Sequence, residues 1–170
     1  MDIIQQLIDF LTQLANNPVS YSIIFYIYCI LAAIVLPIPV ELFLFLGPSV
    51  PFIFKALILG AGKATGSILV FYIGIKVEGP VRWWSQKFKW VAWLVAKMEI
   101  LVAKLRYVGL YIILSIPLMV DTIPIYLWSV FNKEGKEMNV GKFALTNLLA
   151  GFTRAIIVYL VFLAFGIQLV

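Results

Sequence analysis

The sequence predicts an all-α integral membrane protein: an inverted repeat of a re-entrant helical hairpin and a transmembrane helix, with amphipathic interfacial helices. Of its 170 residues, 64% are hydrophobic and 12% are charged, and the mean hydropathy is +1.05. Soluble domains are about 45–50% apolar and about 25% charged, and a chain this small cannot hide so much apolar surface from water. The long uncharged runs are interrupted twice by prolines near a carboxylate, and this repetition predicts the inverted repeat. The chain is expected to form one membrane domain, residues 1–170.

The N-terminal segment, residues 1–17, is expected to form an amphipathic helix. Its apolar residues recur at helical spacing, and no basic residue precedes them as in a secretory signal. Asn17 and Pro18 then break the chain, and residues 19–36, which carry no charge, are expected to form the first transmembrane helix.

Residues 37–55 are interpreted as a first re-entrant hairpin. Prolines, including Pro37 and Pro39, and a glycine interrupt this apolar segment, and such broken backbone is tolerated at membrane depth only where protein buries it. A kinked first helix followed by a hydrophobic loop is the alternative. Residues 56–76 form the next transmembrane helix, in which Gly62 and Gly66 make a small-residue face for close helix contact.

The second half of the chain repeats this order. Residues 80–107 mix Lys and Arg with Trp and long aliphatic residues, which favours a basic amphipathic helix at the level of the lipid head groups over a nucleic-acid-binding segment. Residues 108–131 are apolar but interrupted by Pro117, Asp121 and Pro124, and we expect a second re-entrant hairpin. Residues 141–169 form the last transmembrane helix.

Charge predicts the orientation. If both hairpins return to their own side, residues 76–107 and 132–142 share a face that holds ten of the thirteen Lys and Arg residues. The positive-inside rule makes that face cytoplasmic. The expected location is a multi-pass protein of the plasma membrane, with the N-terminus and residues 76–107 in the cytoplasm. In the rival layout residues 108–131 cross fully, and the 132–142 cluster lies outside.

The candidate functional residues are charged or polar groups within apolar segments. A charged side chain in the bilayer costs at least ~2.5–3.5 kcal/mol, so it should face a cavity and serve a purpose. Burial favours the neutral form of a carboxyl, so Glu41 and Asp121 are candidates for proton exchange. Arg154 either binds an anionic head group or neutralises one of these carboxylates. The expected substrate- or proton-binding set is Glu41, Asp121, Arg154, Lys63, Asn147 and Tyr72, with Pro37, Pro39, Gly62, Gly66, Pro117, Pro124 and Gly151 as structural residues.

Several motifs resemble those of the DedA (VTT-domain, SNARE-associated) membrane family. The first is Pro37-Ile-Pro39-Val-Glu41, followed by a glycine-rich span that ends in Tyr72-Ile-Gly74; the second half contributes Ile116-Pro117 and then Phe143, Asn147 and Gly151. The bacterial members usually carry arginines on either side of the second-hairpin proline, and this chain has none there, which suggests a divergent, archaeal-type branch. The resemblance implies two facing re-entrant hairpins and movement of lipids between leaflets.

The function expected from these observations is transport of an anionic lipid, such as a polyprenyl phosphate or a phospholipid, as a scramblase or flippase with or without proton coupling. A proton-coupled exporter of small molecules or cations is the alternative, and a non-transporting scaffold is a third hypothesis. No enzyme is expected, because nothing pairs a nucleophile with a base, and the chain has no histidine and one cysteine, Cys29. No cofactor, metal or nucleic-acid partner is expected. The expected partners are anionic membrane lipids and protons, with homo-oligomers left open.

Overall fold

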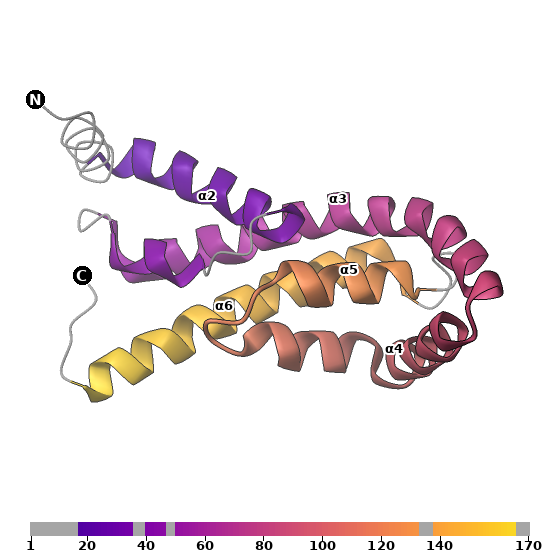
Figure 1. The fold of residues 1–170 in the computed structure, drawn as a ribbon. Coiled ribbons are helices and arrows are strands. Elements are labelled where there is room, and N and C mark those ends of the chain that lie inside the picture. Colours follow the sequence, from indigo (N-terminus) through magenta and orange to yellow (C-terminus); the bar gives the residue numbers. More distant parts are fainter. Residues whose placement is uncertain (1–16, 36–39, 47–49, 133–137, 166–170) are drawn as a thin grey trace, which may run out of the picture.

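The computed structural model describes residues 17–35, 40–46, 50–132 and 138–165, and all the regular secondary structure in these ranges is helical (Figure 1). They form five α-helices and one short 3-10 helix, and this part of the chain contains no strand. The elements are α2 (Pro18–Ile34), η1 (Val40–Phe45), α3 (Phe52–Lys87), α4 (Lys89–Ser115), α5 (Thr122–Val130) and α6 (Val140–Ala164). The all-helical class predicted from composition is therefore confirmed. The expected helix over residues 1–17 lies almost wholly outside the described residues, as do Pro37 and Pro39.

Within these described ranges, two helices are long and apolar enough to cross a membrane. They are the first 26 residues of α3, Phe52–Val77, and the 25 residues of α6, Val140–Ala164. At 1.5 Å per residue each is about 38 Å long, which exceeds the ~30 Å hydrocarbon core of a bilayer. Both lie close to the spans expected over residues 56–76 and 141–169.

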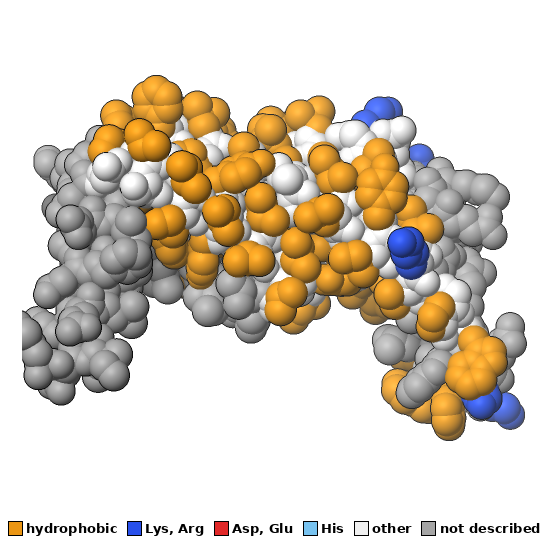
Figure 2. Space-filling view, turned by 90° about the horizontal axis from the view of Figure 1, so that it is seen from above, with side chains coloured by type: hydrophobic (Ala, Val, Ile, Leu, Met, Phe, Trp, Pro, Cys, Tyr) orange, Lys and Arg blue, Asp and Glu red, His pale blue; other side chains and the backbone are white. Residues whose placement is uncertain are grey.

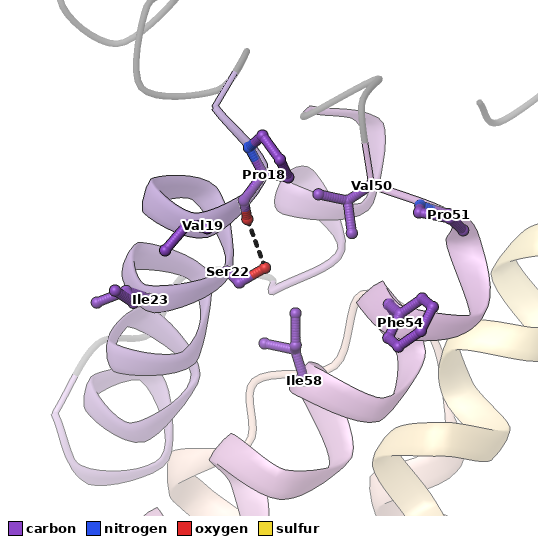
Figure 3. A pocket seen from close by; sticks show the side chains of 8 residues that line it. All are labelled: Pro18, Val19, Ser22, Ile23, Val50, Pro51, Phe54 and Ile58. Atoms are coloured by element: carbon purple, nitrogen blue, oxygen red, sulfur yellow. Dashed lines mark hydrogen bonds between the residues drawn. The ribbon is translucent and has the colours of Figure 1, made fainter.

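The first apolar helix, α2, differs from the expected crossing. Asn17 starts it, since its side chain accepts hydrogen bonds from the amides of Val19 and Ser20 at 3.0 and 3.2 Å. With 17 residues it is about 25 Å long, shorter than the ~30 Å hydrocarbon core. The residues just before α3 lie beside the start of α2 (Figure 3), so the chain turns back between the two helices.

This turn also changes the expected sidedness. Because α3 runs from the end that holds the start of α2 to the far end of the bundle, the start of α2 and the basic segment after residue 76 lie at opposite ends (Figure 1). Sequence reasoning had placed them on the same side, because it took residues 19–36 as a full crossing.

The boundaries of the basic segment are also different. Helix α3 runs through Pro80 to Lys87, α4 begins at Lys89, and a kink divides α4 at Arg106, whose φ of 41° is not helical. The single interfacial helix expected over residues 80–107 is thus the end of α3 plus the first part of α4.

Residues 108–131 form a helix, a break and a returning helix. The end of α4 leads into an irregular turn that contains Pro117, and α5 runs back toward the kink in α4 (Figure 1). After α5 the chain stays at that end, since the backbone amide of Asn139 donates to the Tyr107 hydroxyl at 2.6 Å. Residues 138–142, including Lys142, therefore lie at the same end of the bundle as the kink in α4.

The buried apolar residues form two clusters, one at each end of the bundle. In α3, the residues of the first cluster extend as far as Leu59, and those of the second cluster start at Val70. In α6, the residues of the second cluster extend as far as Ala150, and those of the first cluster start at Ala155. The interval between the clusters contains the buried charges described below.

Candidate functional site: a buried cluster of four charges

Four charged side chains from four separate elements meet between the two apolar clusters. Glu41 comes from η1, Lys63 from α3, Asp121 from the residue before α5, and Arg154 from α6. Their exposed fractions are between 0% and 4%. Lys63 is the twelfth residue of α3 and Arg154 the fifteenth of α6, so both cations lie near the middle of a membrane-length helix.

Arg154 uses all three of its nitrogens within the protein. Nη1 lies 2.7 Å from Asp121 Oδ1, and Nε lies 2.8 Å from Glu41 Oε1. Nε also donates to the carbonyl of Ile116 at 2.9 Å, and Nη2 donates to the carbonyl of Met119. The guanidinium therefore fixes the turn between α4 and α5, as a planar fork of donors is suited to do.

Asp121 is the shared acceptor of the two cations. Its Oδ1 accepts from Lys63 Nζ at 3.0 Å as well as from Arg154. It occupies the N-cap position of α5, yet its side chain makes no capping hydrogen bond. Lys63 Nζ also lies 3.5 Å from the carbonyl of Leu114 at the end of α4. The carboxylate therefore pairs with the two cations and does not cap α5.

Glu41 links η1, in the first proline-interrupted segment, to the turn between α4 and α5, in the second. Its Oε1 accepts from the backbone amide of Leu118, at 2.9 Å, in addition to its contact with Arg154. Leu118 has a φ of 62°, unusual for a residue with a Cβ. In addition, the Thr122 hydroxyl donates to the carbonyl of Ala32 at 2.9 Å, which links the start of α5 to the end of α2.

Two of the three ion pairs in the cluster join the two halves of the chain, while the Arg154–Asp121 pair lies within the second half. Glu41, from the first half, pairs with Arg154 of the second half, and Asp121, from the second half, pairs with Lys63 of the first. With two carboxylates and two cations the formal charge of the cluster is zero. Mutual pairing of this kind is what keeps charges tolerable in a low-dielectric interior.

A glycine precedes each of the two cationic residues by the same number of positions. Gly60 lies three residues before Lys63, and Gly151 three before Arg154. A Cβ added at Gly151 would lie 3.0 Å from the Cα of Gly60 and 3.0 Å from Cδ of Lys63. The two glycines are thus where α3 and α6 approach closely enough for both cations to reach Asp121. Sequence analysis missed Gly60, although the shared Gly-x-x-Lys and Gly-x-x-Arg spacing marks it.

The other expected site residues divide between the interior and the surface. Asn147 is fully buried; its Nδ2 donates to the carbonyl of Phe143 at 2.9 Å, and its Oδ1 accepts no hydrogen bond from the part of the chain that the structure describes. Tyr72 is 54% exposed, nine residues and half a helical rotation from Lys63, so the structure does not bring it to the cluster. Pro117 lies in the turn before Asp121, and Pro124 is buried in the first turn of α5.

Gly62 and Gly66 lie on the side of α3 that packs against α2. A Cβ at Gly62 would lie 2.5 Å from Cβ of Cys29, and one at Gly66 would lie 2.7 Å from Cβ of Ala33. Both positions therefore require the absence of a side chain, because the two helices are in close contact there.

Lys55 is a buried charge that sequence reasoning left out of the site. It is fully buried near the start of α3, and its Nζ donates to the carbonyl of Leu44 at 3.3 Å and lies 5.8 Å from the ring centre of Tyr21. The Tyr21 hydroxyl donates to the carbonyl of Phe43 at 2.5 Å. Both side chains therefore hold the end of η1 against α2 and α3. In sequence Lys55 looks like an ordinary flanking lysine, and nothing local indicates its burial.

An apolar groove opens between α2 and α3 (Figure 3). Its volume is about 410 Å³, and Ser22 supplies the one side-chain polar group of its lining, a hydroxyl that donates to the carbonyl of Pro18 at 2.7 Å. A second groove of about 420 Å³ shares Ser22, Ile23 and Ile58 with it and continues to Ala61, two residues before Lys63. The combined groove suits a hydrocarbon chain and reaches the depth of the charge cluster.

Among the described residues, no group of three or more Cys, Asp or Glu side chains is placed to bind a metal ion. Comparisons of the chain with protein-family models, with curated proteins and with solved structures found no match. The assignment of function therefore depends on the geometry of the chain itself.

Proposed function

We propose that this chain is a multi-pass transporter of the plasma membrane, related to the DedA family, that moves an anionic lipid between leaflets. The observation that carries the proposal is the neutral four-charge cluster, which lies midway along two membrane-length helices where two broken segments meet. Charged groups at membrane depth are costly and mark substrate or ion pathways. Transporters built from inverted repeats place their sites at such a position.

In this proposal the two broken segments are re-entrant hairpins. The first consists of α2 with η1, and the second of the end of α4 with α5; each precedes a membrane-spanning helix, α3 or α6. The crossed ion pairs between the halves support an inverted repeat. The end that holds the two basic segments is cytoplasmic by the positive-inside rule, and the start of α2 lies at the opposite side.

The transport step follows from the contacts of the two cations. In the closed arrangement Arg154 and Lys63 are satisfied by carboxylates and by carbonyls of the second hairpin. When the hairpins separate, these cations lose partners, and the phosphate of a lipid head group replaces them with equivalent charge-assisted hydrogen bonds. The lipid tail lies in the apolar groove between α2 and α3, which opens toward the bilayer.

Proton-coupled export of a small cation is the second candidate, and one observation favours it. Glu41 Oε2 is buried and accepts no hydrogen bond from any described residue. A buried carboxylate oxygen without a donor is suited to hold a proton or a small cation. In that case Glu41→Gln abolishes the dependence of transport on an imposed pH gradient.

A liposome assay distinguishes these functions. Purified protein is reconstituted with a trace of fluorescent phosphatidylglycerol, and a membrane-impermeant quencher measures the outer-leaflet fraction over time. Lipid transport predicts loss of fluorescence from both leaflets, whereas cation export predicts loss from the outer leaflet alone, together with a proton flux. Wild-type protein that leaves the inner leaflet unquenched contradicts the lipid function.

A matched pair of variants tests whether the cluster is the site. The double variant Lys63→Met with Asp121→Asn keeps the cluster neutral, so it should fold but lose a head-group partner and transport slowly. Leu163→Ala, at an exposed position near the end of α6, should transport at the wild-type rate. Wild-type transport by a correctly folded double variant would place the lipid pathway elsewhere.

A further inference from the structure

The first part of α4, residues 89–105, carries an exposed stripe of mixed aromatic, aliphatic and basic side chains. The apolar side chains are unfavourable in water, and the lysines are unfavourable in hydrocarbon. We call this part the basic arm. The stripe recurs along one helical face and consists of Trp90, Trp93, Lys97, Ile100, Leu101 and Lys104. Trp90, Trp93 and Ile100 are 69%, 64% and 63% exposed. On the opposite face of the arm, Val102 is fully buried.

The character of the exposed surface changes at the kink in α4. From residue 107 to residue 116, the exposed residues are Val108, Ile112 and Ile116, all of them aliphatic. The face shown in Figure 2 is likewise covered by hydrophobic side chains, and Lys and Arg side chains gather at the end of the molecule that holds the arm. The kink thus separates a wholly apolar surface from a mixed basic and aromatic one.

The kink is fixed by a specific contact. Arg106 has a φ of 41°, which interrupts the helix, and its carbonyl accepts a hydrogen bond from the indole Nε1 of Trp128 at 2.8 Å. Trp128 is buried in α5. The arm consequently turns away from the long axes of α3 and α6 and lies across the end of the bundle (Figure 1), while remaining attached to the second hairpin.

From these observations we infer that the basic arm docks on the surface of an anionic leaflet, with its Trp and aliphatic side chains among the acyl-chain ends and its lysines on lipid phosphates. Lysines can extend their charge to the head groups while their stems cover apolar surface. Lys97 Nζ lies 5.9 Å from the Trp93 ring centre, so the two residues share one site at the interface. The kink at Arg106 then marks the edge of the hydrocarbon core. This inference depends on the membrane insertion proposed above, and not on lipid transport.

Depth measurements in nanodiscs test it. In a Cys29→Ala background, nitroxide labels at Ile100→Cys, on the arm, and at Ile112→Cys, beyond the kink, probe two positions of similar exposure. Collision with oxygen, which enters lipid, and with a water-soluble nickel chelate reports their depth. The discs contain phosphatidylcholine alone or with phosphatidylglycerol.

We expect the label at position 112 in hydrocarbon in both lipids, and the label at position 100 at head-group depth when phosphatidylglycerol is present. Without anionic lipid, or with Lys97→Gln and Lys104→Gln, the arm label should become more accessible to nickel. Each lysine removed should reduce partitioning of the arm about fivefold, since a basic residue near an anionic surface contributes ~1 kcal/mol.

Three results would overturn the inference. A label at position 100 that is equally accessible to nickel in all discs shows an arm in water. A label shielded from both probes, with spin–spin coupling between protomers, shows that a second copy covers the stripe. A water-exposed label at position 112 contradicts the membrane insertion itself, and the proposed function with it.

Discussion

Removing the charge of Asp121 should destabilise the fold more than removing that of Glu41. Asp121 Oδ1 accepts from both Lys63 and Arg154, at 3.0 and 2.7 Å, so Asp121→Asn leaves two buried cations facing one carboxylate. Removing one partner of a buried ion pair costs ~3–5 kcal/mol. At ~2–4 °C per kcal/mol for a chain of this size, the Tm in detergent should fall by roughly 6–20 °C.

Glu41→Gln provides the comparison at the same site. It weakens one ion pair, while the glutamine oxygen can still accept from the Leu118 amide, and Glu41 Oε2 has no hydrogen bond from a described residue to lose. Loss of a single hydrogen bond to a charged group corresponds to ~1.5–3 kcal/mol. Thermal unfolding followed by circular dichroism should therefore rank the variants wild type, Glu41→Gln, Asp121→Asn.

A double-mutant cycle tests the cause of that ranking. Lys63→Met alone leaves the cluster with an excess negative charge, but combined with Asp121→Asn it restores neutrality, so the double variant should be more stable than Asp121→Asn. The coupling free energy between the two sites should be about 2–3 kcal/mol, near the upper end for residues in contact. Additive effects of the two changes, or a larger loss from Glu41→Gln, would refute the charge-balance argument.

Three further outcomes follow from the structure. Gly151→Ala should destabilise the protein by ~1–3 kcal/mol in denaturant unfolding, because its Cβ would meet α3 at 3.0 Å, whereas Gly79→Ala, with nothing within 4 Å, should be neutral or stabilising. Trp128→Phe should cost ~1–3 kcal/mol in the same measurement by leaving the carbonyl at the α4 kink without its 2.8 Å donor; an unchanged midpoint would show that the contact is dispensable. Single cysteines at Val19 and Lys87, in a Cys29→Ala background, should react with impermeant reagents from opposite sides of the membrane, and labelling from one side would contradict the proposed topology.

Sequence reasoning located the charges of the site, because a charged residue within an apolar run is costly wherever the chain places it. That argument depends on composition alone, and it singled out Glu41, Lys63, Asp121 and Arg154, which the structure brings together. The sequence offered Glu41 or Asp121 as a carboxylate that Arg154 neutralises, but the partner of Lys63 and the backbone partners of Arg154 were not predictable in the same way. They are set by crossed pairs between segments 58 to 113 positions apart, and by backbone carbonyls of an irregular turn.

The limits of the sequence are clearest in α2 and Lys55. An uncharged run of 18 residues predicts a crossing whether or not the chain turns back afterwards, because hydropathy contains no information on direction. Lys55 likewise looks like a flanking lysine near the water interface, yet the carbonyl of Leu44 and the ring of Tyr21 accommodate it in the interior. Both features depend on where η1 packs, which is a property of the assembled fold.

Charge balance also relates the two roles considered for Arg154. Its nitrogens are occupied by Asp121, Glu41 and the turn after α4, so in the closed arrangement it is a structural cation that joins the two halves. In the proposed transport cycle the same donors hold a head group only after the halves separate. Structural pairing and lipid binding are then successive states of one residue. An anionic ligand stabilises the open state because it supplies the negative charge that separation removes from the cations. A neutral lipid cannot do so, and the proposed cycle therefore predicts selectivity toward anionic lipids without a preformed head-group pocket.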